Sequence, residues 1–586
     1  MENPAPDFSP ESGSLLFAHA FADQCQRWAQ QAGAPKTAIA AVARAGHLLA
    51  LKNAEGHLCW PLPPEEAEYW RTQLAASGIV GNAHPLCLSH DRLWLARHFT
   101  TRQRLAAALV ARHRQPMPAP GEAAQTTLRQ LFADAPEGDG QALAAAVALD
   151  QRLVIVSGGP GTGKTATVAK ILACLLADTP DLRIALAAPT GKAAARIEES
   201  IGKAAATLPP SLAAPLLRVE AQTLHRLLGL RPDGGKPRHY SENPLPVDVL
   251  VVDEASMLDP ESALALCDAL PAAARLLLLG DRHQLQSVEA GAVFAALSRQ
   301  TGFSENCRAT LARRLGWSPT AIPAIPDAPK TNFPLRDAVV WLTRSHRFDS
   351  TSALGQLASA LACGDLSGVA RILDAGDAAA RLEETLNFPE IRAGFAPYRA
   401  ALSQWHGTAD KTATLTEIFR AFSAFRVLCA VRQGEHGVES LNARLETAFA
   451  PGFNRKTAVL FPGQPLLILK NDPATRLANG DVGIALEDAA GIGVWFPEGA
   501  DFRRVAPARL PPWESAYAMT AHKSQGSEFE RVALVLPQQD APILSRELVY
   551  TALTRARKGI HIFGSRPLFL QAAARPTQRD GDLFAD

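Results

Sequence analysis

A glycine-rich octapeptide, GGPGTGKT at residues 158–165, has the residue types and spacing that bind nucleotide phosphates. It matches G-x-x-x-x-G-K-[ST] and stands between the apolar run 153–156 and the helical pattern ATVAKILACLL. Glycines let backbone N–H groups converge on phosphate oxygens, and the N-terminus of the following helix adds its positive dipole. Lys164 is expected to reach the β- and γ-phosphates, and Thr165 to hold Mg²⁺. The nucleotide-binding set predicted here is Gly158, Gly159, Pro160, Gly161, Thr162, Gly163, Lys164 and Thr165.

Two carboxylates and a glutamine in later segments have the chemistry to hydrolyse the bound ATP. In DVLVVDEASM, Asp253 is placed to hold the Mg²⁺ shell and Glu254 to polarise the attacking water. Such a pair at the end of a buried strand is costly unless a cation lies beside it. In RLLLLGDRHQLQ, Gln284 can contact both the γ-phosphate and the water, because an amide donates and accepts without carrying charge.

Three further residues are predicted to complete the ATP site. Arg347 in WLTRSHRF and Arg555 in ELVYTALTRARKG lie in a second α/β region. An arginine that reaches across a domain cleft stabilises the transferring phosphoryl group, with an effect of about 10³–10⁵ on the rate. Gln141 precedes the glycine loop and could bind both edges of adenine, although a position on a helix surface explains it nearly as well.

The elements that must position these residues are buried strands alternating with helices. From about 124 to 345 the runs RLVIVSG, RIALAAPT, DVLVVDEAS and RLLLLGD predict a parallel α/β sheet. Each run ends in a polar segment, and open α/β sheets bind ligands at that edge. A second α/β region over 346–586 contains the runs FRVLCAVR, RVALVLP and GIHIFG. Residues 455–510 alternate apolar and polar residues around Asn-Gly and Asp-Pro turns, which predicts a small β-rich, SH3-like insertion.

Two other regions frame these domains. Residues 1–112 are rich in Ala, Leu and His, end in the amphipathic pattern RQRLAAALVARHR, and predict a helical domain. Residues 113–123 contain three prolines and read as a linker. Residues 300–335 predict an irregular insertion.

Composition limits the classes of function. The 586 residues suggest roughly three to five domains, and 59 Lys+Arg against 58 Asp+Glu give a net charge of +1. A nucleic acid would therefore have to bind a local groove rather than a basic protein. The eight cysteines form no C-x-x-C pair, the N-terminus is acidic rather than signal-like, and no uncharged apolar stretch approaches the ~20 residues that span a bilayer. We expect a cytoplasmic protein without membrane contact.

The order of these motifs resembles superfamily-1 helicases, and most closely the RecD family, the alpha subunits of exonuclease V. The segments that carry the resemblance include APTGKAAARIEES, TLHRLLG, VVDEASM, GDRHQLQSVEAG, NGDVGIAL, AMTAHKSQGSEF and ELVYTALTRARKG, and they cover most of 140–565. The resemblance implies two RecA-like motor domains with ATP and Mg²⁺ in the cleft between them. It also implies 5′→3′ unwinding at double-strand breaks within the heterotrimeric RecBCD complex.

The resemblance also implies which residues meet single-stranded DNA and which link it to the nucleotide. Short hydroxyls, backbone amides and a few cations at strand ends hold phosphates without reading bases, as a translocating motor requires. Gln525, Gly526 and Glu528 would couple the second track to ATP, the last two as nucleotide-binding residues. The DNA-binding set is Pro189, Thr190, Lys192, Arg196, Thr223 and His225 in the first domain, and Thr520, His522, Lys523 and Ser524 in the second.

The family places RecB and RecC beside such a chain, with residues 1–112 docking on these partners and the nuclease in RecB. The tryptophans of that region suit either an interface or a core. We see no carboxylate cluster for metal-dependent DNA cleavage besides Asp253 and Glu254. Three alternatives stay open: an autonomous RecD-like 5′→3′ helicase, a DNA-binding subunit whose ATPase has lapsed, and a non-helicase P-loop ATPase.

Overall fold

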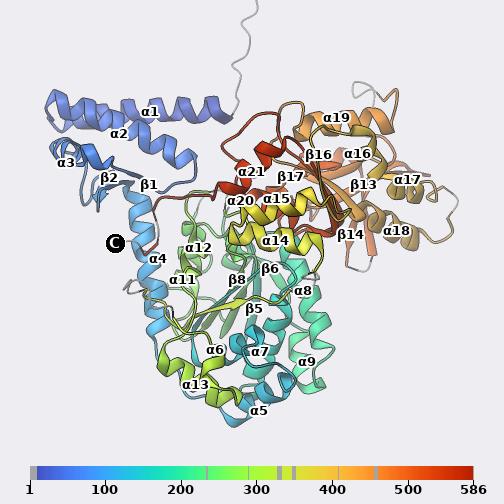
Figure 1. Ribbon diagram of the computed structural model, residues 1–586, viewed down its shortest axis with the longest axis horizontal. Coiled ribbons are helices and arrows are strands. Elements are labelled where there is room, and N and C mark those ends of the chain that lie inside the picture. Colours follow the sequence, from blue (N-terminus) through green and yellow to red (C-terminus); the bar gives the residue numbers. More distant parts are fainter. Residues whose placement is uncertain are drawn as a thin grey trace, which may run out of the picture.

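The chain forms two α/β domains with a helical N-terminal module beside them (Figure 1). The computed structural model describes residues 10–231, 235–287, 289–325, 333–345, 351–406, 408–453, 460–499, 501–581 and 583–584. Within these residues no helix combines the length and the apolar character needed to cross a membrane.

The first α/β domain is built on a six-stranded parallel sheet of order β6-β5-β7-β8-β4-β9. Hydrophobic clusters cover both of its faces, which explains why its central strands are continuous apolar runs. Its strands are β4 (Leu153–Gly158), β5 (Ile184–Ala188), β6 (Ala221–Thr223), β7 (Val249–Val252), β8 (Arg275–Gly280) and β9 (Val339–Leu342). Its helices are α5 (Glu122–Leu131), α6 (Gly140–Asp150), α7 (Lys164–Asp178), α8 (Gly191–Ala205), α9 (Pro210–Leu216), α10 (Leu224–Leu228), α11 (Pro260–Ala269), α12 (Val293–Leu297) and α13 (Glu305–Leu315).

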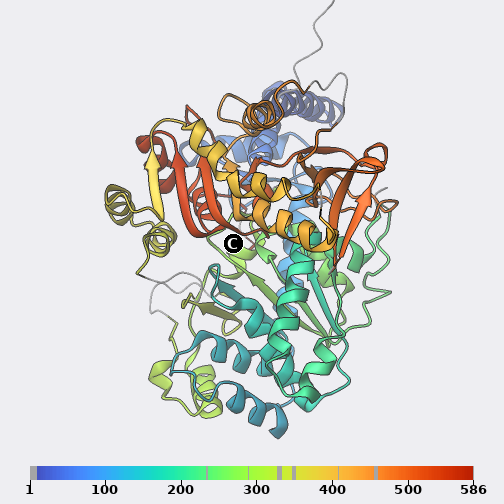
Figure 2. The same ribbon diagram turned by 90° about the vertical axis from the view of Figure 1, so that its right-hand side faces the viewer.

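The second α/β domain has a five-stranded parallel sheet of order β10-β19-β18-β11-β17, above the first in Figure 2. Its strands are β10 (Ala380–Glu383), β11 (Phe425–Cys429), β17 (Ala518–Thr520), β18 (Phe529–Val535) and β19 (Ala556–Phe563). Its helices are α14 (Ala353–Cys363), α15 (Leu366–Asp374), α16 (Phe388–Gly394), α17 (Ala396–Leu402), α18 (Lys411–Ala424), α19 (Val438–Phe449), α20 (Arg546–Leu553) and α21 (Arg566–Ala574). Two stacked RecA-like α/β domains confirm the predicted fold class.

An antiparallel sheet of order β15-β14-β13-β12-β16 is inserted between β11 and β17. Its strands are β12 (Pro465–Ile468), β13 (Val482–Asp488), β14 (Gly491–Glu498), β15 (Asp501–Val505) and β16 (Trp513–Ser515). This β-rich unit confirms the predicted insertion, and its own small core is aliphatic and aromatic.

The N-terminal module is less purely helical than expected. Helices α1 (Pro10–Gln31), α2 (Lys36–Ala54) and α3 (Ala67–Ala76) are joined by a small antiparallel sheet, β1-β3-β2. Its strands are β1 (Cys59–Pro61), β2 (Leu86–Ser89) and β3 (Arg92–Leu95), three or four residues each, which is too short for a visible period-2 pattern. A second departure is α13, which lies where the sequence predicted an irregular segment.

Helix α4 (Ala96–Arg114) joins this module to the first α/β domain and packs on α11. The buried Arg112 donates hydrogen bonds to the carbonyls of Leu270, Pro271 and Ala274. The C-terminal segment closes the same junction from the other side, because the N–H of Leu58 donates to the carbonyl of Asp580. The N-terminal module is therefore held by both a helix and the C-terminal segment.

Candidate active site and nucleic-acid track

The glycine loop connects β4 to α7 in the geometry that a phosphate cradle needs. Gly161 and Gly163 have φ of 77° and 80°, in the left-handed region that favours glycine, so both bends depend on the residue type. Lys164 Nζ donates to the carbonyl of Gly158 at 2.6 Å, which holds its ammonium over the loop. Gln141 on α6 donates to the carbonyl of Thr162 at 3.1 Å. The structure thus brings Gln141 to the nucleotide loop, although the sequence alone left its role open.

The two predicted carboxylates lie directly after β7, the strand two places from β4 in the sheet. Glu254 has φ of 50°, an uncommon value for a non-glycine residue, and its N–H donates to Asp253 Oδ1 at 2.8 Å. Burial and the neighbouring Glu254 raise the pKa of Asp253 to about 6, while Lys164 acts in the opposite direction. A carboxyl group held in this way gains from a cation, which fits a Mg²⁺ ligand.

Gln284 is buried beyond the end of β8, in a turn that contacts the second α/β domain. Its Nε2 donates to Asp281 at 3.2 Å, and its Oε1 is buried without a hydrogen-bond partner among the described residues. Asp281 also accepts a hydrogen bond from Tyr550 Oη at 3.0 Å, and the N–H of Leu285 donates to Thr551 Oγ1 at 2.8 Å. An unpartnered acceptor at this position suits a hydrogen bond from a water or a hydroxyl of the substrate.

Arg555 reaches the same place from the second domain, where it precedes β19. It is 3% exposed and donates to the carbonyls of Thr551 and Ser527 at 3.2 and 3.3 Å. Burial lowers its pKa, while Glu254 and Asp281 raise it. Arg347, the other predicted arginine, lies outside the described residues, and its role stays a prediction.

These residues enclose one cleft of about 540 Å³ between the two domains. The lining of the cleft carries both signs of charge, as a site for a metal-bound triphosphate requires. It is lined by Pro160, Gly161, Gly163, Lys164, Thr165, Ala166, Ala193, Arg196, Ser200, Lys203, Ala204, Asp253, Glu254, Gln284, Glu528 and Arg555. The cradle, the unpartnered amide oxygen and the carboxylate beside Lys164 fit ATP; Thr165 and Asp253 are the residues that would hold Mg²⁺.

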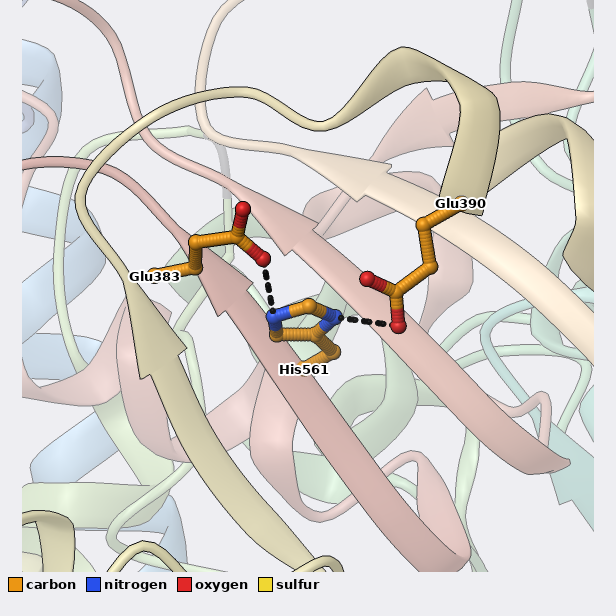
Figure 3. Close-up of side chains that lie close together, drawn as sticks. All are labelled: Glu383, Glu390 and His561. Carbon is orange, nitrogen blue, oxygen red and sulfur yellow. Dashed lines mark hydrogen bonds and ion pairs between the residues drawn. The ribbon is translucent and has the colours of Figure 1, made fainter.

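A second group of potential metal ligands lies at the far edge of the second sheet (Figure 3). Among the described residues, Glu383, Glu390 and His561 bring ligand atoms within 4.8 Å of one another. The two carboxylates lie against opposite ring nitrogens of His561, at 3.3 and 3.1 Å. The Arg381 guanidinium pairs with Glu390 and approaches His561 Nδ1 at 3.1 Å. It therefore already provides the positive charge that a metal ion would bring.

In the first domain, the predicted track residues lie at and after the ends of the adjacent strands β5 and β6, where Ala188 is paired with Thr223. Thr190 and Thr223 are the N-cap residues of α8 and α10, and they accept hydrogen bonds from the N–H groups of Ala193 and Arg226 at 3.2 and 3.3 Å. His225 is exposed. The structure thus places these two strand ends side by side, on the sheet edge that also carries the nucleotide loop.

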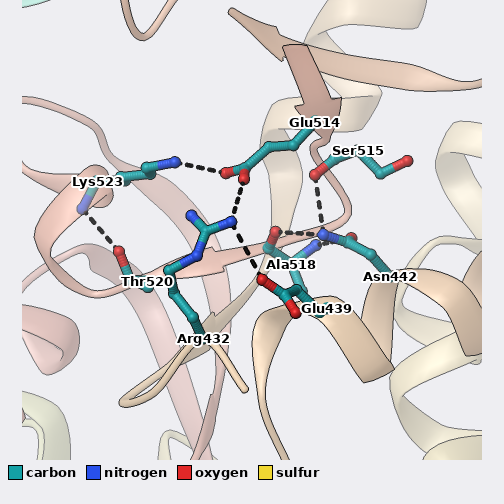
Figure 4. A network of polar contacts seen from close by, with 8 residues as sticks. All are labelled: Arg432, Glu439, Asn442, Glu514, Ser515, Ala518, Thr520 and Lys523. Carbon is teal, nitrogen blue, oxygen red and sulfur yellow. Dashed lines mark hydrogen bonds and ion pairs between the residues drawn. The ribbon is translucent and has the colours of Figure 1, made fainter. Parts of the chain in front are cut away.

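In the second domain, the predicted track begins at the end of β17, the edge strand of the sheet on the side away from β10 (Figure 4). Asn442 fixes this strand through two hydrogen bonds with the backbone of Ala518, at 2.8 and 3.0 Å. Thr520 Oγ1 accepts from the N–H of Lys523 at 3.3 Å, and Lys523 Nζ is paired with Glu514 at 2.7 Å. Glu514 also accepts from Arg432 at 2.9 Å. The cations of this track are therefore partly neutralised by a carboxylate of the β insertion.

The remaining residues of this segment point inward. Ser524 is fully buried and donates to the carbonyl of Ala521 at 2.6 Å, so its hydroxyl shapes the turn. Burial and Arg579 lower the pKa of His522. Gln525 crosses to the first domain and donates to the carbonyl of Leu285, next to Gln284, at 2.7 Å. The segment after β17 thus connects the predicted DNA track to the ATP cleft by a direct hydrogen bond.

Arg196, which the family resemblance assigned to the DNA track, lies in the ATP cleft. It forms an ion pair with Glu528, and both residues line the cleft. Sequence reasoning also missed the contacts of Tyr550 with Asp281 and of Thr551 with Leu285. The quoted motifs contain these residues, but nothing in a linear pattern pairs two segments about 270 positions apart.

Comparison with known proteins agrees with this geometry. A model of an AAA domain matches residues 141–290, and a model of a UvrD-like helicase C-terminal domain matches residues 515–563. The chain is 37% identical to the RecBCD enzyme subunit RecD of Mycobacterium tuberculosis (strain ATCC 25618 / H37Rv), over 92% of this chain and 87% of that protein. The chain belongs to the RecD family.

The chain is also similar to another RecBCD enzyme subunit and to a RecD2 helicase. The RecBCD enzyme subunit RecD of Haemophilus influenzae is 34% identical over 76% of this chain and 72% of that protein. The ATP-dependent RecD2 DNA helicase of Deinococcus radiodurans is 32% identical over 72% of this chain and 48% of its own length. Among solved structures, the Pif1 helicase from Candida albicans aligns with 79% of this chain and 97% of that chain, at 17% identity and a TM-score of 0.38.

Proposed function

We propose that this chain is the ATP-driven 5′→3′ motor subunit of a RecBCD-type complex, in which it unwinds duplex DNA at double-strand breaks. As a member of the RecD family the chain is an ATP-dependent DNA helicase. The observation that carries the mechanism is the cleft between the two α/β domains, where Lys164, Glu254 and Gln284 of one domain face Arg555 of the other. Catalytic groups divided between two domains make hydrolysis depend on how those domains are arranged.

In the proposed reaction, the glycine loop and Lys164 bind the phosphates of ATP while Gln141 contacts the base. Mg²⁺, held by Thr165 and Asp253, would neutralise the developing phosphate charge. Glu254 orients and polarises the attacking water, and Gln284 Oε1, which has no hydrogen-bond partner among the described residues, accepts a hydrogen bond from it. Arg555, together with Arg347, stabilises the transferring phosphoryl group from the second domain. Closing on ATP and opening after hydrolysis would move the second DNA track relative to the first.

The partner proteins RecB and RecC are proposed from the names of the mycobacterial and Haemophilus relatives, which are RecBCD enzyme subunits. Identity to the mycobacterial subunit is higher than identity to RecD2, at 37% against 32%, which favours a subunit over an autonomous helicase. We also propose that the chain does not cut DNA by itself. The one cluster of potential metal ligands among the described residues is Glu383, Glu390 and His561, and Arg381 is paired with its Glu390. This guanidinium takes the place of the metal ion that DNA cleavage would need.

The test is unwinding of duplexes that carry a single-stranded tail on only the 5′ or only the 3′ side, by the isolated chain and by its complex with co-purified partners. We expect unwinding from the 5′ tail, and Lys164→Gln should abolish it because the phosphate cradle loses its charge. Unwinding only in the complex supports the subunit role, and robust unwinding by the chain alone supports the autonomous alternative. A preference for the 3′ tail would contradict the proposed polarity. ATP hydrolysis that DNA does not stimulate would contradict the motor itself.

A further inference from the structure

One ion-pair triad crosses the ATP cleft and connects the two DNA tracks. Glu528, whose side chain is 7% exposed, lies between two guanidinium groups. Arg196 on α8 contacts one carboxylate oxygen, and Arg557 contacts the other at 2.7 Å. Arg196 belongs to the first domain, whereas Glu528 and Arg557 belong to the second. The carboxylate is therefore shared between the two domains, and it lines the cleft between them.

The backbone around Glu528 is fitted to α8 as well. Gly526 has φ of 69°, and a Cβ atom added there would lie 3.5 Å from the Cβ of Ala193. Arg196 also reaches the carbonyl of Gly526 at the long distance of 3.5 Å. The left-handed backbone is what favours glycine at this position, since a Cβ atom there would make only an ordinary van der Waals contact with the helix. The segment 526–528 thus contacts α8 through its backbone and through its carboxylate.

Arg196 and Glu528 each lie in a segment that directly continues one of the two predicted DNA tracks. Helix α8, which carries Arg196, begins directly after Thr190 of the first track. Glu528 follows residues 520–524, the predicted DNA track of the second domain, and directly precedes β18. Burial and the nearby Arg555 lower the pKa of Arg196, while Glu254 and Asp253 act in the opposite direction. A single guanidinium on α8 therefore contacts the segment that follows the second DNA track and lines the same cleft as Asp253 and Glu254.

We infer that Arg196 is a positioning residue of the ATPase rather than a DNA contact: it holds Glu528 in the cleft and so makes hydrolysis depend on the two DNA tracks. This inference rests on the proposed function. Removing Arg196 takes away the ion pair that holds Glu528 from the first domain, whereas Arg557, whose side chain is 58% exposed, belongs to the same domain as Glu528. The segment 526–528 then loses its fixed position against α8. Gln525 directly precedes this segment and Arg555 donates to the carbonyl of Ser527 within it, so both side chains shift relative to the first domain.

The deciding experiment compares Arg196→Gln with Lys192→Gln, an exposed residue one turn earlier on α8 and a candidate DNA contact. For each variant, affinity for a single-stranded oligonucleotide is measured by fluorescence anisotropy without nucleotide, and ATPase kcat at saturating oligonucleotide. Arg196→Gln should keep DNA affinity within about twofold and lower the DNA-saturated kcat about tenfold or more, because a small misplacement of catalytic groups has effects of this order. Lys192→Gln should show the opposite split.

A tenfold loss of DNA affinity with normal kcat in Arg196→Gln would overturn the inference, and so would no change in either quantity. If both quantities fall, Glu528→Gln and the double variant decide. Non-additive losses in kcat support the pairing, and additive losses contradict it. Arg196→Lys keeps the charge without the two-pronged geometry, so it should restore part of kcat, and it replaces Arg196→Gln should that variant fail to fold. A wild-type chain whose ATPase ignored DNA would instead contradict the proposed function.

Discussion

At the scale of single residues, the ATP cleft holds its charges at a cost that its substrate relieves. Asp253 lies beside Glu254 at the end of a buried strand, and its pKa is raised by burial and by that neighbour. Gln284 keeps a buried amide oxygen without a partner among the described residues. Both features oppose stability in the free protein and favour a complex with a metal-bound phosphate, because such groups gain most from a ligand that satisfies them.

Asp253→Asn is expected to stabilise the free protein. A carboxyl group whose pKa rises from 3.8 to about 6 on folding makes the wild type lose stability as pH rises from about 4 to about 6, with no further loss above. One pKa unit corresponds to about 1.4 kcal/mol, so the gain at pH 7 should be at most about 2–3 kcal/mol. Thermal melting in EDTA across this pH range measures it.

The matched control is Asp134→Asn, which changes an exposed aspartate and should leave the melting temperature nearly unchanged at every pH. Adding Mg²⁺ and ATP should reverse the order, because only the wild-type carboxylate then gains a cation. A wild type that melts above Asp253→Asn at pH 7 in EDTA would show that the carboxylate is already satisfied without metal.

Sequence patterns predicted the hydrolytic residues better than their long-range contacts. The glycine loop, Asp253 and Gln284 each follow a buried strand, and the ends of parallel strands in one sheet meet at one edge, so their proximity follows from local patterns. Arg196 was assigned by its motif alone, and its direction depends on how α8 meets a segment 330 residues later. No periodicity carries that information, because it arises only when two domains pack.

At the scale of elements, helix α4 transmits the position of the N-terminal module to the first α/β domain. Arg112 is 7% exposed and donates to the carbonyls of Leu270 and Ala274 after α11, so its guanidinium is the buried polar contact of this junction, beside the more exposed Arg104–Asp268 ion pair. The sequence predicted the helix from its amphipathic pattern. It could not predict that this arginine faces inward, nor the short strands β1–β3, because three-residue strands are stabilised by tertiary contacts rather than by their own pattern.

Arg112→Leu should therefore destabilise the chain by about 2–4 kcal/mol, because it leaves several buried carbonyls without donors. Arg114→Leu, two residues further on an exposed position of the same helix, should change stability by less than about 0.5 kcal/mol. Urea unfolding followed by tryptophan fluorescence gives both values. Equal effects of the two substitutions would mean that the helix is held by its apolar face alone.

At the scale of the whole molecule, the proposed DNA path is weakly charged for a DNA-binding protein. The net charge is +1, and the predicted tracks contain more hydroxyls and helix N-termini than cations. Lys523, one of the few cations, is already paired with Glu514 of the β insertion. A motor that releases and rebinds its strand in every cycle is compatible with such a path, because strong phosphate neutralisation would oppose movement.

The affinity for single-stranded DNA should accordingly depend only weakly on salt. Each neutralised phosphate contributes about −0.7 to the slope of log K against log salt concentration, so two or three cation contacts predict a slope between about −1 and −3. Anisotropy titrations of an unstructured oligonucleotide at about 50 to 300 mM NaCl measure this slope. Glu514→Gln frees Lys523, while Arg432 keeps its ion pair with Glu439 at 3.4 Å, so the slope should become steeper by about one phosphate contact. A wild-type slope near −6 would place the strand on a basic surface other than the two strand-end tracks.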